Sequence, residues 1–125
     1  MARRLPALGA QELAIMKVVW RLKDASVRDV YEDIRERRAV AYTTVMTMMN
    51  TLETKGYLKK HLDGRAFRYR PAVPEQRVVG AMVRDFVERV FDGGAAALLT
   101  HLVSESSLSD EERRELRRLI DEVDK

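Results

Sequence analysis

The sequence predicts a mainly helical protein with a small β-hairpin wing, built as an N-terminal winged helix-turn-helix followed by a C-terminal helical dimerisation region. Three observations predict this fold class. Apolar residues recur at helical spacing through most of the chain, a basic segment of two alternating strands follows the third helical pattern, and two prolines separate that segment from the helices after it. A chain of 125 residues has room for one small domain and a helical extension.

The first two predicted helices carry clear start signals. Gly9 precedes the first apolar pattern as an N-cap, and Glu12 occupies the third helical position. After a break at residues 23–25, Ser26 is expected to cap a second, shorter helix, with Asp29 completing its capping box. The charged residues 35–38 end this helix.

The third predicted helix runs from Tyr42 to Lys55 and stops at Gly56, which tolerates the positive φ of a helix C-terminus. Its core-facing residues are Val45, Met48, Met49 and Leu52. The opposite face is uncharged and rich in threonine, although threonine lowers helix propensity. In a helix-turn-helix this helix enters the major groove, where short polar side chains reach base edges and an Asn can bond adenine through both amide atoms. The predicted DNA-binding residues of this helix are therefore Tyr42, Thr43, Thr44, Met46, Thr47 and Asn50.

Residues 57–70 form the predicted hairpin. Asp63-Gly64 between two short alternating segments indicates a two-residue type I′ turn, which needs positive φ at both positions. Around this turn Lys60, Arg65 and Arg68 are expected to bind backbone phosphates. Taken alone, a basic hairpin is also compatible with charges that are simply solvated.

Helical apolar stripes fill residues 74–125, which we predict as a dimerisation domain after a DNA-binding domain of residues 1–73. About 50 residues in three such helices are too few for a good core of their own. We therefore expect their stripes to pack against the same helices of a second copy, with two-fold symmetry. The predicted dimerisation residues are Val79, Met82, Val83, Phe86, Val90, Phe91, Leu98, Leu99, Leu102, Leu116, Leu119 and Ile120.

Charge is distributed unevenly between the two predicted domains. Residues 1–73 hold 15 Lys or Arg against 8 Asp or Glu, whereas residues 74–125 hold 8 against 12. A basic head joined to an acidic tail is typical of a phosphate-binding domain with a tail that does not bind, although a generally arginine-rich composition would also give a basic half.

Several classes of function are excluded by what the sequence lacks. It has no cysteine, and His61 and His101 are not spaced as a metal-ligand pair, so we expect no metal and no cofactor. It also has no Ser/His/Asp grouping, no Gly-rich phosphate loop and no paired-carboxylate signature, so we expect no catalytic function. Apolar runs are too short to span a membrane, and the start lacks the apolar stretch of a signal peptide. A cytoplasmic protein without membrane contact is the expectation.

Residues 41–56 and 64–71, together with residues 12–20 and 108–116, resemble the penicillinase-repressor family of BlaI, MecI and CopY type. The resemblance implies a homodimeric transcriptional repressor that occupies a palindromic double-stranded DNA operator and releases it on a signal. In β-lactam-responsive members a regulatory protease cuts between an Asn and a Phe, and these positions correspond to His101 and Leu102, where that dipeptide is not retained. Copper-responsive members bind metal through C-terminal cysteines, which this chain lacks.

Two other interpretations remain open on the sequence. In the first, the chain is a protein-protein adaptor whose winged helix does not read DNA; it predicts no preference for the chain's own upstream region over random DNA. In the second, the chain is a free-standing dimerisation module, whose residues 1–73 bind nothing. Under the DNA-binding hypothesis, Asn50→Ala reduces specificity, whereas Arg68→Ala weakens binding to all sequences.

Overall fold

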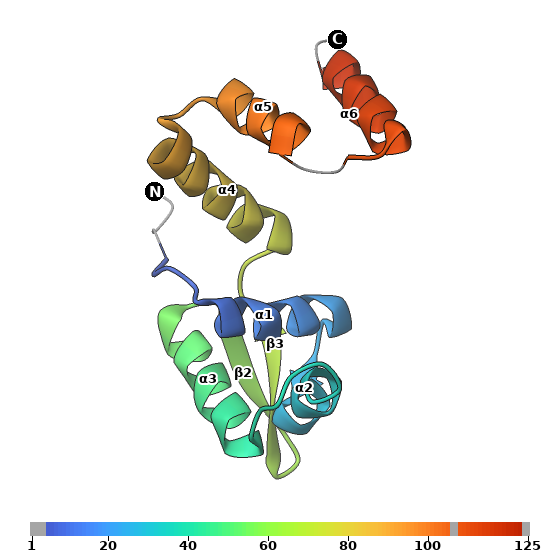
Figure 1. Ribbon diagram of the computed structural model, residues 1–125. Helices are drawn as coiled ribbons and strands as arrows, with labels where there is room; N and C mark the ends of the chain where they lie inside the picture. The colour runs from blue at the N-terminus through green and yellow to red at the C-terminus, as the bar shows by residue number, and fades with distance from the viewer. Residues whose placement is uncertain (1–4, 106–107, 124–125) are drawn as a thin grey trace. The chain divides into compact units, whose positions relative to one another are not determined.

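The computed structural model of the chain describes residues 5–105 and 108–123 (Figure 1). The chain divides into two units, Met1–Val79 and Gly80–Lys125, and each is described by itself.

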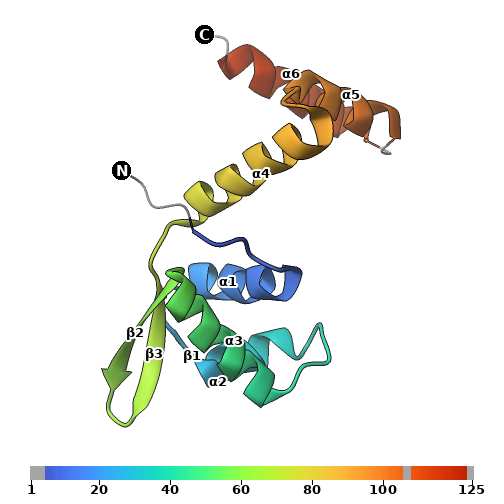
Figure 2. The same cartoon turned by 90° about the vertical axis from the view of Figure 1, so that its left-hand side faces the viewer.

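The first unit consists of three helices packed on a small antiparallel sheet. The helices are α1 (Ala10–Leu22), α2 (Val27–Ile34) and α3 (Tyr42–Lys55), and the strands are β1 (Ala25–Ser26), β2 (Leu58–Asp63) and β3 (Ala66–Pro71). The strand order is β1-β3-β2. Figure 2 shows the β2–β3 hairpin, called the wing below, with the helices to one side of it. The winged helix-turn-helix fold predicted from the sequence is confirmed, with one strand more than expected.

The additional strand is β1, which lies where the sequence indicated only a break between helices. Its two residues pair with β3, Ala25 opposite Tyr69 and Ser26 opposite Arg68. Ala25 and Tyr69 are both buried. The short strand therefore attaches the turn between α1 and α2 to the middle strand of the sheet.

Local capping contacts set the helix boundaries as the sequence predicted. The Glu12 carboxylate accepts a hydrogen bond of 2.9 Å from the Gly9 N–H at the start of α1. At the start of α2, Ser26 Oγ accepts from the Asp29 N–H and Asp29 Oδ2 accepts from the Ser26 N–H, both at 3.0 Å. Gly56 ends α3 with a φ of 94°. These contacts satisfy backbone groups that a helix end leaves without a partner.

The wing turn lies one residue later than predicted. Asp63 pairs with Ala66, so the two turn residues are Gly64 and Arg65 rather than Asp63 and Gly64. Gly64 has a φ of 67°, and Arg65 does not share a positive φ. Positive φ at the first turn position alone is the pattern of a type II′ turn, in which glycine takes that position. The correction places Arg65 at the tip of the wing.

The hydrophobic core of the first unit lies between the helices and the sheet. Its fully buried large side chains are Met16, Met49, Leu52, Leu58, Val19, Val30 and Val45. Met48, which the helical spacing assigned to the core, is half-buried at the edge of α3. Three of the four predicted core positions of α3 are thus buried, which fixes the opposite face toward solvent.

A largely buried ion pair ties α1 to α3. Lys55 Nζ lies 2.9 Å from Glu12 Oε2, and the two side chains are 27% and 12% exposed. Burial alone would raise the pKa of Glu12, but the Gly9 N–H and the Lys55 ammonium outweigh it and keep the pKa below its usual value. Glu12 therefore serves both as a helix cap and as an interhelical contact.

We expect Glu12→Gln to lower the free energy of unfolding by about 1–2 kcal/mol, because the glutamine leaves the Lys55 ammonium without its counter-charge. Chemical denaturation of the full chain measures the change. Glu75→Gln is the matched control, because its partner Lys17 is 3.7 Å away and both side chains are about half exposed. Equal losses for the two variants would contradict the role assigned to Glu12.

The second unit continues from α4 (Glu75–Phe91) through α5 (Ala95–Glu105) and α6 (Asp110–Val123). Ser109 Oγ accepts from the Glu112 N–H at 3.1 Å, which caps α6. The Phe86 and Phe91 rings meet edge to face, with centroids 5.8 Å apart. All core residues of the described chain lie between Ile15 and Val78, so the described part of the second unit contributes none. In the described residues, no helix is long and apolar enough to cross a membrane.

Candidate nucleic-acid interface

The outer face of α3 is exposed along its length. All six side chains predicted to read DNA lie on it and are exposed: Tyr42, Thr43, Thr44, Met46, Thr47 and Asn50. Near the end of the helix the hydroxyls of Thr51 and Thr54 donate back to the carbonyls of Thr47 and Asn50, at 3.0 and 3.1 Å. In the described chain the structure gives no such partner to the hydroxyls of Thr43, Thr44 and Thr47. The first two turns of α3 therefore present free hydroxyl groups.

Asn50 is tied to the wing. The Tyr69 hydroxyl donates to Asn50 Oδ1 at 2.9 Å. Burial raises the pKa of Tyr69, so its hydroxyl stays protonated and able to donate. Because Oδ1 already accepts one hydrogen bond, an adenine bound through both amide atoms would have to share this oxygen with Tyr69. This contact, which orients the Asn50 side chain, could not be read from residue spacing, because the two residues lie on different elements.

The strand register assigns the wing residues to two faces. Lys60 lies opposite Tyr69 and Leu62 lies opposite Phe67, so these side chains share the face that Tyr69 turns toward α3. Lys60 Nζ sits 4.7 Å from the centroid of the Phe67 ring. Leu62 is 64% exposed and Phe67 is 45% exposed. The site predicted from the sequence did not include these two apolar residues. The feature that could have indicated them is a pair of large apolar side chains next to the basic tip of the hairpin.

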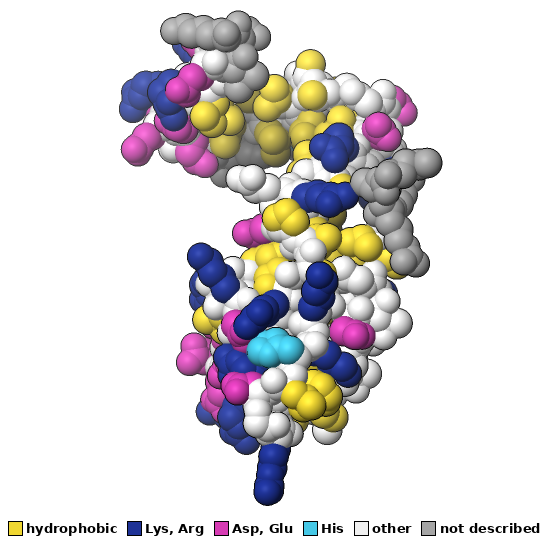
Figure 3. Space-filling model, turned by 180° about the vertical axis from the view of Figure 1, so that it is seen from behind, with side chains coloured by type: hydrophobic (Ala, Val, Ile, Leu, Met, Phe, Trp, Pro, Cys, Tyr) yellow, Lys and Arg dark blue, Asp and Glu magenta, His cyan; other side chains and the backbone are white. Residues whose placement is uncertain are grey.

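Arg68 and Arg70 lie on the other face of the wing, with Lys59 and His61 as their cross-strand neighbours. From behind, the first unit shows Lys and Arg side chains interleaved with Asp and Glu (Figure 3). The structure thus separates the three cations predicted to bind phosphate. Lys60 is on the face toward α3, Arg65 is at the tip, and Arg68 points away from α3.

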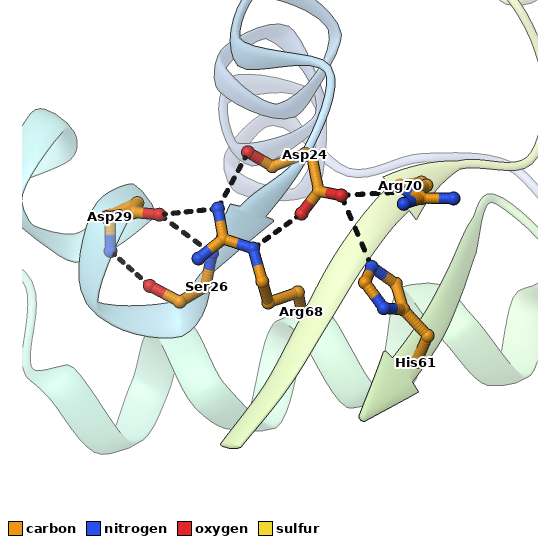
Figure 4. Close-up of polar contacts among 6 residues, drawn as sticks. All are labelled: Asp24, Ser26, Asp29, His61, Arg68 and Arg70. Atoms are coloured by element: carbon orange, nitrogen blue, oxygen red, sulfur yellow. Dashed lines mark hydrogen bonds and ion pairs between the residues drawn. The ribbon is translucent and has the colours of Figure 1, made fainter. Parts of the chain in front are cut away.

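A polar network, the Asp24 cluster, occupies this second face: Asp24, Ser26, Asp29, His61, Arg68 and Arg70 (Figure 4). Arg68 Nε donates to Asp24 Oδ1 at 2.7 Å, and Arg70 Nε donates to Asp24 Oδ2 at 2.8 Å. His61 Nε2 is 3.3 Å from the same Oδ2. Arg68 Nη2 also reaches the Asp24 carbonyl oxygen at 3.3 Å and Asp29 Oδ2 at 3.4 Å. One carboxylate from the turn before β1 thus holds two arginines of β3.

The hydrogen bonds from Arg70 and Arg68 lower the pKa of Asp24 to about 2. A carboxyl group with a pKa lower in the folded chain than in the unfolded chain stabilises the fold above the unfolded pKa of about 4, and this contribution disappears as the pH falls to about 2. We expect the Asp24 carboxyl carbon to titrate near pH 2 in an NMR experiment on the folded chain. In Arg70→Gln the midpoint should rise, because Arg70 contributes the largest lowering. A midpoint close to 4 in the unaltered chain would contradict the cluster.

The residues predicted for dimerisation and for cleavage lie after the wing. None of the twelve stripe residues predicted for dimerisation is buried in the described structure. Val83, Phe86, Val90, Leu119 and Ile120 are among its exposed large apolar side chains. His101 and Leu102 are exposed within α5. The described residues include no group of three or more His, Cys, Asp or Glu side chains that could hold a metal ion.

Residues 8–122 match the family model described as Penicillinase repressor. The chain is 27% identical to the penicillinase repressor of Bacillus licheniformis over 120 residues, which cover 96% of this chain and 94% of that protein. It is 34% identical to the transcriptional regulator BlaI of Mycobacterium tuberculosis over 123 residues, covering 97% and 88%.

Solved structures of other proteins are also similar to this chain. The monomeric form of Bacillus licheniformis BlaI in complex with the blaP half-operator superposes with a TM-score of 0.52 at 29% identity, covering 60% of this chain and 92% of that one. A MarR family protein from Bacillus stearothermophilus superposes with a TM-score of 0.52 over 96% of this chain and 78% of that one. At 19% identity, the second likeness shows the fold alone.

Proposed function

The chain belongs to the penicillinase repressor family of DNA-binding transcriptional repressors, and we propose that α3 and the wing of each copy bind one half of a palindromic operator. The observation that carries this proposal is the pairing of an exposed hydroxyl-rich face on α3 with a basic wing tip beside it. We infer that the protein acts as a homodimer. Its place of action in this proposal is the cytoplasm. The adaptor interpretation gives no reason for an uncharged recognition face of this kind.

The first turns of α3 supply the base readout. A helix fits the major groove, and its N-terminal residues come closest to the base edges. Thr43 and Thr47 lie one turn apart on the exposed face, and their hydroxyls can both donate and accept. Met46 precedes Asn50 by one turn on the side of the wing, where a thymine methyl would meet an apolar side chain.

Lys60 and Arg65 supply the phosphate contacts. We expect Lys60→Ala and Arg65→Ala each to reduce the slope of log affinity against log salt by about 1, on operator and random DNA alike. Fluorescence titrations at several salt concentrations measure the slope. Lys17→Ala is the control, since Lys17 is on α1 and pairs with Glu75. An unchanged slope in both wing variants would count against the wing as a phosphate-binding element.

The helices after the wing supply the dimer contacts. Their apolar stripes have no buried residue within the described second unit, and contiguous exposed apolar patches mark interaction sites. A second copy of the same helices would cover the stripes and would place two recognition helices on the two halves of a palindrome.

We also infer that a regulatory protease releases the operator by cutting the chain. The corresponding peptide bond, between His101 and Leu102, lies inside α5. Leu98, Leu99 and Leu102 of α5 are among the residues proposed for the dimer contact, so a cut at this bond would weaken the dimer and with it the binding to the operator. Mass spectrometry of the protein recovered from induced cells tests this step; an intact chain after release of repression would exclude it.

Mapping of the bound sites across the genome tests the function as a whole. We expect a small number of palindromic sites whose half-sites are about one helical turn of DNA apart, or a multiple of it. Footprinting with purified protein should protect both half-sites together. Binding without preference for any site at moderate salt would overturn the proposal and favour an adaptor.

A further inference from the structure

The Asp24 cluster leaves two of the wing's arginines without an evident task in DNA binding. Arg68 and Arg70 belong to the basic hairpin, yet both guanidinium groups are held by one carboxylate on the face turned away from α3. Asp24 comes from the turn between α1 and β1, 44 residues before Arg68. The cluster is therefore a tertiary contact made specifically between this turn and the wing.

We propose that Asp24 is a positioning residue that takes the place of a DNA phosphate for Arg68 and Arg70 and so keeps these arginines from adding to sequence-independent binding. The inference rests on the proposed DNA-binding function. It concerns the phosphate contacts, which act on operator and random DNA alike, and not the base contacts.

A carboxylate and a phosphate compete for the same guanidinium donors. Both accept short, charge-assisted hydrogen bonds from arginine. Asp24 has the advantage of being part of the same molecule, so its effective concentration at the two arginines exceeds that of any phosphate in solution. Arg68 is held most firmly, because its guanidinium also reaches the Asp24 carbonyl oxygen and Asp29.

The position of Arg68 explains why its release would matter for DNA. The pair Asp63 and Ala66 closes the wing turn, and Arg68 is two residues further along β3, opposite His61. A long side chain freed at this point starts close to the tip that carries Arg65. It could then add phosphate contacts to any DNA on which the wing lies.

Such contacts would raise affinity without adding information about sequence. Phosphate contacts supply nearly all of non-specific binding, whereas base contacts supply the discrimination. Arginines released from Asp24 would therefore raise the affinity for operator and random DNA by about the same factor. Holding them inside the protein limits this sequence-independent affinity.

The test compares the full-length chain with its Asp24→Asn variant on random duplex DNA at several salt concentrations. We expect the variant to bind with a salt slope steeper by up to about 1.8, the value for two added phosphate contacts. Between 50 and 200 mM salt this corresponds to an extra fall in affinity of about 12-fold. At low salt the affinity of the variant for random DNA should exceed that of the unaltered chain, whereas the ratio of operator to random affinity should change little, because phosphate contacts are the same on both. A slope and an affinity for random DNA equal to those of the unaltered chain would overturn the proposal.

A second set of variants assigns the effect to the arginines. In the Arg68→Gln/Arg70→Gln background, the further change Asp24→Asn should leave the salt slope unchanged, because no guanidinium remains to be released. Glu75→Gln removes a carboxylate of the same charge outside the cluster and reports the general effect of net charge. A gain in slope that persists without the two arginines would contradict the mechanism.

The arginine variants also decide the matter if Asp24→Asn fails to fold. Arg68→Gln/Arg70→Gln alone should keep the salt slope of the unaltered chain on random DNA, because both arginines are already held by the Asp24 carboxylate; a loss of about 1 or more would show that they bind phosphate and would overturn the inference. Failure of the proposed function is distinguishable, since the unaltered chain would then show no preference for an operator.

Discussion

Phe86→Asp is expected to convert the proposed dimer into a monomer and to weaken binding to the proposed palindromic operator by about 100-fold or more. Phe86 is 42% exposed in the middle of the α4 stripe, with its ring against that of Phe91. An aspartate at this position would place a charge in the proposed apolar contact between two copies, where burial of a charge is costly. The two recognition helices would then bind their half-sites separately and lose the benefit of linkage.

Sedimentation of the full chain at several concentrations measures the first effect, and operator titration measures the second. Ala81→Asp is the matched control, since it adds the same charge to the exposed, opposite side of α4. This control should remain a dimer and keep its operator affinity within about threefold. A Phe86→Asp chain that still sediments as a dimer would contradict the role given to the α4 stripe.

Those features of the fold that depend on neighbours in the chain were predictable from the sequence. The capping pairs of α1 and α2 join residues three positions apart, so spacing alone revealed them. The two-residue strand β1 was not predictable, because it exists only through pairing with β3, more than 40 residues later. The turn of the wing was misplaced by one residue because Asp63-Gly64 and Gly64-Arg65 both contain the glycine that the turn requires.

The candidate site shows the same division. Helical periodicity identified the exposed face of α3, because burial of Val45, Met49 and Leu52 fixes the direction of every other side chain on that helix. Periodicity could not show that Arg68 has a carboxylate partner, since Asp24 lies in another element. A basic residue in a hairpin therefore predicts a charge at that place, but the charge available to a ligand depends on tertiary partners.

Replacing Thr43 and Thr47 together by alanine is expected to separate DNA recognition from stability. We expect the affinity for the operator to fall by about 10- to 100-fold, because a good base contact contributes about 1–3 kcal/mol of discrimination. Affinity for random DNA should hardly change, since no cation is removed. The free energy of unfolding should rise by about 1 kcal/mol, because alanine has the higher helix propensity and both positions are exposed.

The opposite signs make this prediction demanding, because loss of binding cannot then be attributed to loss of folding. Thr54→Ala is the matched control: Thr54 is also exposed on α3, but its hydroxyl is already donated to the Asn50 carbonyl oxygen. It should stabilise the helix and change operator affinity by less than about threefold. If the Thr43→Ala/Thr47→Ala chain bound the operator as tightly as this control, base readout by the first turns of α3 would be refuted, and discrimination would have to come from the wing or from the shape of the DNA.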